Sequence, residues 1–174
     1  MPSPSDNHLS ACLRAQRGFT LIELMIVVTL LGVFAAIAVP SFTELINKSR
    51  TQSLNNELIS LLQYTRSTAV EQRTFLKACK ETNNGRDSWS VKRKCDDSNE
   101  DPLRKLDIPE TLKVTASIDA ISFRYNGTGT TAQLVTCKSD DFANGFTIDV
   151  NSSGNIRTWP RGQKGTSTNM TECK

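Results

Sequence analysis

The most apolar stretch of the sequence reads Phe19-Thr-Leu-Ile-Glu-Leu-Met-Ile-Val-Val-Thr-Leu-Leu-Gly-Val-Phe-Ala-Ala-Ile-Ala-Val39, and Pro40 follows it. A helix rises about 1.5 Å per residue, so a helix over these residues would span about 30 Å, the thickness of the hydrocarbon core of a bilayer. Pro40 has no backbone N–H, and we expect it to kink the helix or to cap its membrane half. The stretch therefore predicts a helix that crosses a membrane.

The residues before this stretch, 1–18, are polar, contain Arg14 and Arg17, and end in Gly18. In a secretory signal peptide the apolar region is shorter, and the small residues of the cleavage site follow it. Here the small residue precedes the apolar stretch, so a cut after Gly18 would remove a polar leader and leave the apolar stretch on the chain. The two arginines would hold that leader on the cytoplasmic face.

Glu23 is the one charged residue within the apolar stretch. A carboxylate in an apolar membrane helix costs on the order of 2–3 kcal/mol on insertion scales, and such residues tend to be functional. One interpretation is that the side chain lies near the membrane surface and reaches the head groups. The other requires cleavage, which creates a cationic amine on Phe19. The amine of a neighbouring chain would then neutralise Glu23 and fix the register between subunits.

The segment Gly18-Phe19-Thr-Leu-Ile-Glu23-Leu-Met-Ile-Val-Val resembles the type III signal of type IV pilins and type II secretion pseudopilins. The similarity extends over residues 17–40 and includes Pro40. It implies that a prepilin peptidase cleaves between Gly18 and Phe19 and that Phe19 is then N-methylated. It also implies that the helix mediates assembly into a filament, with Glu23 and Pro40 as assembly positions.

Beyond Pro40 the apolar residues recur every three or four positions, which predicts an amphipathic helix over residues 41–73 that continues the apolar one. From residue 74 the period changes to two, which is typical of strands. We expect strands at 74–80, 88–92, 112–115, 117–125, 132–138, 146–150 and 155–159, and a loop at 96–110. The predicted fold is α+β, a long N-terminal helix packed on a largely antiparallel sheet.

The predicted organisation is a cleaved leader at 1–18, a transmembrane and assembly helix at 19–40, and a periplasmic globular domain at 41–174. Within that domain the helix covers 41–73 and the β-rich part covers 74–174. This order resembles the minor pilin and pseudopilin family that includes FimT, FimU and GspH, and residues 56–70 resemble the second half of that family's helix. The resemblance implies a pilin-like fold.

Five cysteines are present, at positions 12, 79, 95, 137 and 173. Cys12 would leave with the leader, and the remaining four allow three pairings. An oxidising periplasm favours disulfides. We expect Cys79–Cys95 and Cys137–Cys173, the second of which would hold a polar C-terminal tail. A zinc site is not expected because there is no C-x-x-C spacing and the single histidine, His8, lies in the leader.

The stretch Gly154–Gly165 is cationic and glycine-rich. The residues that could contact DNA are Arg157, Trp159, Arg161 and Lys164, through phosphates and base stacking. Some FimT-type minor pilins bind DNA through a G-R-x-R motif near this place, and the present segment Gly154-Asn-Ile-Arg157 keeps the glycine and the last arginine only. The alternative is a solvated basic loop, or a tryptophan buried in the sheet.

The chain has 174 residues, of which 37% are hydrophobic and 22% charged, with a net charge of +3. Such a balance argues against wholesale disorder and against a dedicated nucleic-acid coat protein. Without an imidazole in the processed chain, neither a Ser-His-Asp triad nor a Cys-His pair can form, so no enzyme, cofactor or metal is expected.

The predicted function is that of a minor pilin in type IV pilus initiation or tip assembly. The alternatives are a GspH-like minor pseudopilin of type II secretion and a DNA-binding minor pilin for natural transformation. The expected partners are the prepilin peptidase, other minor pilins with the major pilin (or pseudopilins), inner-membrane lipid before assembly, and DNA. The expected location is the bacterial inner membrane, crossed once, with the C-terminal domain in the periplasm.

Overall fold

A computed structural model describes residues 18–96, 100–139 and 141–173. The predicted leader, apart from Gly18, lies outside the described residues, as do His8 and Cys12. The chain divides into two compact units, one up to Phe42 and the other Thr43–Lys174. This division falls two residues beyond Pro40.

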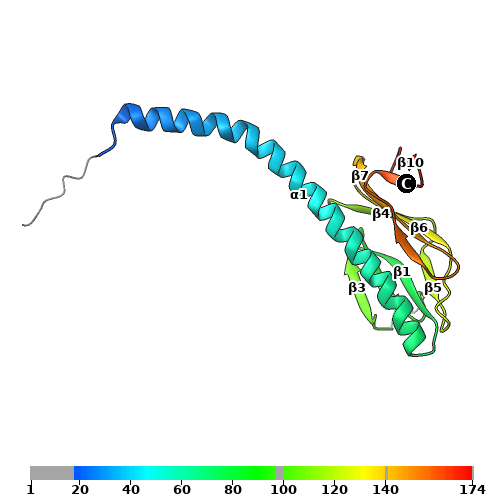
Figure 1. The fold of residues 1–174 in the computed structure, drawn as a ribbon. Helices are drawn as coiled ribbons and strands as arrows, with labels where there is room; N and C mark the ends of the chain where they lie inside the picture. Colours follow the sequence, from blue (N-terminus) through cyan, green and yellow to red (C-terminus); the bar gives the residue numbers. More distant parts are fainter. Residues whose placement is uncertain (1–17, 97–99, 140, 174) are drawn as a thin grey trace, which may run out of the picture. The chain divides into compact units, whose positions relative to one another are not determined.

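Helix α1 runs from Leu21 to Glu71 and contains Pro40. In the second unit its leucines recur at helical spacing and are buried, because one face of this part packs on the sheets. The buried apolar residues of α1 are Leu54, Leu58, Leu61, Leu62 and Ala69. In Figure 1 this C-terminal part of the helix lies across the strands of the β-rich region. The predicted helix 41–73 is thus present and ends two residues earlier.

In the part of the chain that the structure describes, ten strands follow the helix. Their bounds are β1 Leu76–Asn83, β2 Arg86–Lys92, β3 Arg104–Asp107, β4 Lys113–Ala116, β5 Ala120–Phe123, β6 Ala132–Lys138, β7 Asp141–Val150, β8 Ile156–Thr158, β9 Gln163–Gly165 and β10 Thr168–Asn169. The pairings between these described strands are all antiparallel. The predicted loop at 96–110 is wrong in part, because β3 lies within it and pairs with β2.

The strands form two four-stranded sheets rather than the single sheet that the alternation predicted. Sheet A has the order β3-β2-β1-β5, and sheet B has the order β4-β6-β7-β8. A separate two-stranded ribbon, β10-β9, was not predicted, because its residues are polar. The hairpin between β1 and β2 turns through Asn84 and Gly85, both with positive φ, which is the geometry of a two-residue hairpin turn.

One apolar core joins the helix to both sheets. Trp89 and Phe123 from sheet A and Leu134 and Ile148 from sheet B are all fully buried in it. Sheet B carries a second, smaller cluster on its other face, where Val135 and Cys137 pack with Met170. The C-terminal tail therefore covers the face of sheet B that the helix does not.

Candidate functional site

The side chain of Thr20 caps the start of α1, and this cap was not predicted from the sequence. The Oγ1 atom of Thr20 accepts a hydrogen bond from the backbone N–H of Glu23 at 3.3 Å. Thr20 is thus the N-cap and Glu23 the third helical residue, and the spacing Thr-x-x-Glu is that of a capping box. The same spacing could have been read from the sequence. A negative charge in the first turn also interacts favourably with the helix dipole.

Glu23 and Phe19 are both exposed, with 85% of the Phe19 surface accessible. No ion pair involves Glu23 within the described part of the chain. Among residues 18–96, 100–139 and 141–173, therefore, no cation pairs with this carboxylate. The position of Glu23 in the first turn of the helix is compatible with the predicted pairing with a cation of another chain.

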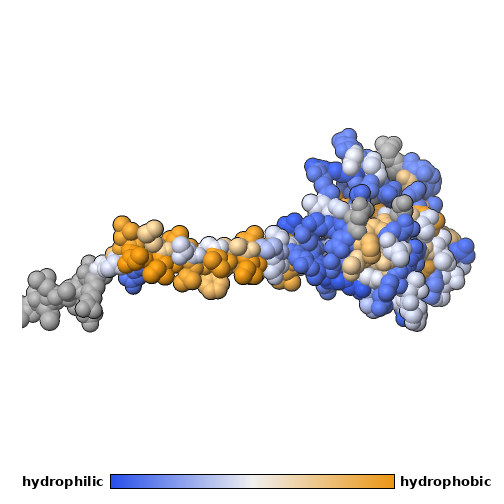
Figure 2. Space-filling model, turned by 90° about the horizontal axis from the view of Figure 1, so that it is seen from above, coloured by the Kyte–Doolittle hydropathy of each residue, from blue (hydrophilic) through white to orange (hydrophobic). Residues whose placement is uncertain are grey.

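The first unit exposes almost every large apolar side chain that it contains. These residues are Phe19, Leu21, Ile22, Leu24, Met25, Ile26, Val27, Val28, Leu30, Leu31, Val33, Phe34, Ile37, Val39 and Phe42. Figure 2 shows them as a continuous hydrophobic surface on this part of the helix. Among the described residues α1 is the one helix long and apolar enough to cross a membrane. A surface of this extent requires lipid or other apolar helices around it.

Two disulfides brace the second unit. Cys79 is bonded to Cys95, and Cys137 is bonded to Cys173, with Cα–Cα distances of 5.6 and 5.9 Å. These are the pairs expected from the sequence, and both distances are usual for disulfides. The second one anchors the tail against sheet B, where Thr115 also donates a hydrogen bond to the backbone oxygen of Cys173.

The cationic stretch predicted to contact DNA packs largely against its own domain. The indole N–H of Trp159 donates a hydrogen bond to the carboxylate of Asp149 on β7. The guanidinium carbon of Arg157 lies 3.9 Å from the centre of the Trp159 ring, a cation–π contact. Trp159 is half-buried, so its ring and its polar tip are both engaged within the fold.

Arg161 is likewise held by contacts within its own domain. Its guanidinium donates to the side-chain oxygen of Gln52 on α1 at 3.1 Å and lies 5.2 Å from the centre of the Phe146 ring. Lys164 is half-buried on β9. Gln52 and Asp149, which orient these side chains, could not be found from the sequence because they lie far away in the chain. DNA contact by this stretch stays a prediction.

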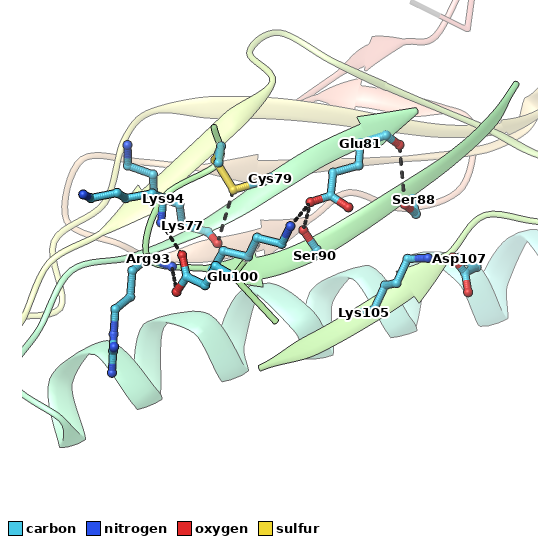
Figure 3. A network of polar contacts seen from close by, with 12 residues as sticks. Lys77, Cys79, Glu81, Ser88, Ser90, Arg93, Lys94, Glu100, Lys105 and Asp107 are labelled. Atoms are coloured by element: carbon cyan, nitrogen blue, oxygen red, sulfur yellow. Dashed lines mark hydrogen bonds and ion pairs between the residues drawn. A yellow bond between two sulfur atoms is a disulfide. The ribbon is translucent and has the colours of Figure 1, made fainter. Parts of the chain in front are cut away.

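A polar network lies on the face of sheet A opposite the core, shown in Figure 3. Lys92 is only 6% exposed, and its ammonium lies 2.7 Å from the carboxylate of Glu81. Ser90 donates to the same carboxylate oxygen at 2.8 Å. The hydrogen bond from Lys92, aided by that from Ser90, holds the pKa of Glu81 below its ordinary value despite partial burial. The ion pair with Glu81 compensates the burial of Lys92, which would otherwise lie inside the fold without an opposite charge.

The loop after β2 is closed by a carboxylate as well as by a disulfide. Glu100 accepts hydrogen bonds from the backbone N–H groups of Arg93 and Lys94, at 3.0 and 3.1 Å. Figure 3 shows Glu100 beside these two residues. The described residues contain no group of three or more His, Cys, Asp or Glu side chains that could hold a metal ion.

Two family models match the chain. The description "Prokaryotic N-terminal methylation motif" applies to residues 13–39, and "Type II transport protein GspH" applies to residues 54–154, more than half of the chain. The methylation motif implies processing by a prepilin peptidase. It covers the apolar stretch, so the chain is a membrane-anchored, pilin-like protein.

Among curated proteins, the type IV major alpha-pilin of Moraxella bovis is 52% identical over 46 residues, which are 26% of this chain and 29% of that protein. A fimbrial protein of Pseudomonas aeruginosa is 39% identical over 59 residues, 34% of this chain and 38% of that protein. The chain thus matches well under half the length of these curated relatives.

Among solved structures, the type IV minor pilin FimU of Pseudomonas aeruginosa matches in two crystal forms. One match has a TM-score of 0.61 at 26% identity and covers 76% of this chain and 99% of that one. The other has a TM-score of 0.58 at the same identity and covers 71% and 99%. The pilin-like α+β fold expected from the sequence is therefore confirmed. Taken together, the two family models and the fold show that the chain belongs to the GspH family of type IV pilins and type II pseudopilins, which are structural proteins and not enzymes.

Proposed function

We propose that this protein is a minor subunit of a type IV pilus, acting in pilus initiation or at the tip. The observation that carries the proposal is the likeness to the minor pilin FimU, which extends over 76% of this chain at a TM-score of 0.61. The similarity extends into the β-rich part, whose surface can differ most between pilin-like proteins that share one fold. The sheets would supply the exposed surface of the subunit. The apolar helix would attach the subunit to its neighbours.

Processing precedes assembly in this proposal. The peptidase cleaves between Gly18 and Phe19, the new amine of Phe19 is methylated, and the leader is lost. Before assembly the apolar stretch spans the inner membrane once, with the second unit in the periplasm. The disulfides of the second unit support that placement, because they form in oxidising compartments.

Assembly then transfers the exposed apolar surface of the first unit from lipid to the helices of neighbouring subunits. Glu23 has no intramolecular ion pair within the described chain, and in an apolar filament interior it would have to be neutralised. The amine of Phe19 on an adjacent subunit supplies the opposite charge. The pairing sets the axial register because each carboxylate has a single favourable position.

The second candidate is a minor pseudopilin of the type II secretion system, and the family description "Type II transport protein" favours it. Both machines would use the same helix, the same cleavage and the same charge pair. They differ in the neighbours that surround the subunit. The partners, rather than the fold, therefore distinguish the two functions.

The test uses the full chain with a C-terminal tag, expressed in its own bacterium. A photo-crosslinker placed at exposed Val28 on the helix would capture adjacent subunits, which mass spectrometry identifies. We expect cross-links to pilus subunits, and sheared surface filaments that contain the tagged chain only when the major pilin gene is intact. Cross-links to pseudopilins alone would assign the protein to secretion instead, and a chain without any cross-linked pilin-like neighbour would contradict both functions.

A further inference from the structure

A pocket of about 730 Å³ opens at the β5 edge of sheet A, on the face opposite the core. We call it the β5 pocket, and it lies apart from the cationic stretch discussed above. The residues that line it are Phe75, Lys77, Ser122, Arg124, Asn126, Thr128, Gly129, Thr130 and Ser152. Its volume lies within the range of roughly 300–1,000 Å³ that is typical of small-molecule sites.

The strand register explains why these residues share one face. Lys77 on β1 lies opposite Ser122 on β5. The segment after the next turn continues the sheet, because Phe123 pairs with Gly129 and the N–H of Thr130 donates to the oxygen of Ser122. Phe123 and Gly129 face the core, so their neighbours in the chain face outward. Side chains from three adjacent segments thus form one surface.

The pocket is rich in donors and lacks negative charge. No carboxylate lines it among the described residues, whereas Lys77 and Arg124 bring two cations. Within the described chain neither cation forms an ion pair, and the hydroxyls of Ser122 and Ser152 have no hydrogen-bond partner. These four groups are therefore available to a ligand that brings acceptors and an anionic group.

The wall of the pocket is held in place by contacts beneath it. Arg66 on α1 donates to the backbone oxygen of Gly127 at 3.0 Å, and the N–H of Gly129 donates to the oxygen of Ser152 at 3.1 Å. Gly154 packs so closely on Gly127 that a Cβ there would lie 1.9 Å from its oxygen. The loops on both sides of the pocket are thus fixed before any ligand arrives, which lowers the entropic cost of binding.

Exposed aromatic rings border the same surface. Phe75 and Tyr125 are 50% and 55% exposed, and their ring centres lie 6.1 Å apart in an edge-to-face arrangement. Most aromatic residues of the domain are buried or half-buried, so two exposed rings beside two cations are unusual in this molecule. The apolar face of a cyclic ligand could pack on Phe75 while its polar groups meet the donors.

We propose that the β5 pocket binds an acidic saccharide, with the carboxylate of a uronic-acid unit at Arg124 and Lys77. A sugar ring offers hydroxyl oxygens to Ser122 and Ser152 and a C–H face to Phe75, and its carboxylate matches the planar fork of an arginine. A nucleic-acid strand is the less suitable ligand, because binding of its regular phosphates depends on many cations and only two line this pocket. The proposal does not depend on which filament contains the subunit.

The test measures binding of fluorescently labelled trigalacturonate to the full chain in an amine-oxide detergent, whose head group is neither a sugar nor a phosphate. Galactotriose is the uncharged probe, and an oligothymidylate of 12 nucleotides is the nucleic-acid probe. We expect trigalacturonate to bind at least tenfold more tightly than either. Arg124→Gln should weaken that binding roughly tenfold or more, since hydrogen bonds to charged groups contribute about that factor.

Phe75→Leu should weaken trigalacturonate binding severalfold, and Arg157→Gln, which changes a cation outside the pocket, should leave it unchanged. Arg124 is exposed, so its variant should unfold at the same temperature as the parent chain. Absence of trigalacturonate binding, equal binding of the neutral trisaccharide, or an unchanged Kd in Arg124→Gln would each overturn the proposal. Tighter binding of oligothymidylate would overturn the saccharide assignment. Filament incorporation of the same variants is a separate readout, so failure here leaves the proposed function standing.

Discussion

Glu81 shows how one carboxylate allows a lysine to lie inside a small domain. Lys92 is 6% exposed, and Glu81 is the acid that pairs with it, so removing the carboxylate leaves a buried ammonium without compensation. We expect Glu81→Gln to lower the free energy of unfolding by roughly 1.5–3 kcal/mol at neutral pH, the usual value of a charged hydrogen bond. Urea unfolding followed by tryptophan fluorescence would measure it.

The pH dependence of this effect has a definite sign. The folded-state pKa of Glu81 is lowered from an ordinary value of 4.5, so its stabilising contribution is present above that value. The contribution is lost as the pH falls through the folded-state pKa, because the carboxyl is then protonated in both states. The difference between parent and Glu81→Gln should therefore be constant above about pH 6 and shrink below pH 4.5. Glu110→Gln, which breaks an ion pair whose partners are 73% and 72% exposed, should change stability little at any pH.

Gly154 is required for a different reason, the close approach of two loops. Its φ is +75°, and a Cβ would lie 1.9 Å from the backbone oxygen of Gly127. Gly154→Ala should lower the free energy of unfolding by about 2–4 kcal/mol, since overpacking adds to backbone strain. Gly85→Ala is the matched control, because Gly85 has a φ of +77° and open space around it. The control should cost only about 1 kcal/mol; equal costs for the two variants would show that the contact with Gly127 is unimportant.

Among the elements, the helix and the central strands could be predicted from the sequence alone. The period of the leucines in 54–62 matches the face that packs on the sheets, and β6 has the predicted bounds. Each of these segments carries its own alternation of apolar and polar residues, which reflects its burial. The N-terminal methylation motif could also be recognised, because the residues that compose it are contiguous.

Other elements could not be predicted because their partners are distant. Strand β3 has the sequence Arg-Lys-Leu-Asp, without apolar alternation, and exists because β2 offers it an edge. The ribbon β9–β10 is polar and depends on the tail being held by Met170 and a disulfide. The division into two sheets follows from β5 pairing with β1 instead of a neighbour in sequence. The β5 pocket combines segments from 75 to 152, so no local pattern indicates it.

Removal of the disulfide between β6 and the tail would test whether the ribbon β9–β10 depends on that anchor. Its two cysteines are 36 residues apart, and closing a loop of that length contributes about 4 kcal/mol in the chain-entropy model. We expect the double variant Cys137→Ser with Cys173→Ser to lose a large part of that stability. Hydrogen exchange should become faster first in β9 and β10, because Met170 loses its anchor.

The disulfide between Cys79 and Cys95 closes a shorter loop, with a separation of 16 residues. The double variant Cys79→Ser with Cys95→Ser should therefore lose about 3 kcal/mol of stability. It should leave exchange in β9 and β10 unchanged. Faster exchange spread evenly over both sheets in either variant would contradict the idea that the tail is a separately anchored element.

At the scale of the whole molecule, the two units require different surroundings. The second unit has a core of its own, as soluble domains do, in which Leu58, Trp89 and Phe123 are fully buried. The first unit exposes a continuous run of apolar side chains that water does not tolerate. Under the proposed function, the domain would fold in the periplasm while the helix exchanges lipid for the helices of other subunits. The one charge in the exposed run, Glu23, must satisfy both environments, and this makes it the residue on which assembly can be tested.

Glu23→Gln separates charge from helix capping. Glutamine also completes a Thr-x-x-Glu/Gln capping box, so the helix should start normally, whereas the negative charge is lost. We expect normal cleavage, seen as an unchanged mass of the processed chain, but at least tenfold less of the variant in sheared filaments relative to the membrane pool. Thr20→Val removes the cap and keeps the charge, and should reduce incorporation far less. Glu71→Gln, at the far end of the same helix, is the control for a charge change alone. If Thr20→Val were as defective as Glu23→Gln, helix capping rather than charge pairing between subunits would explain the role of Glu23.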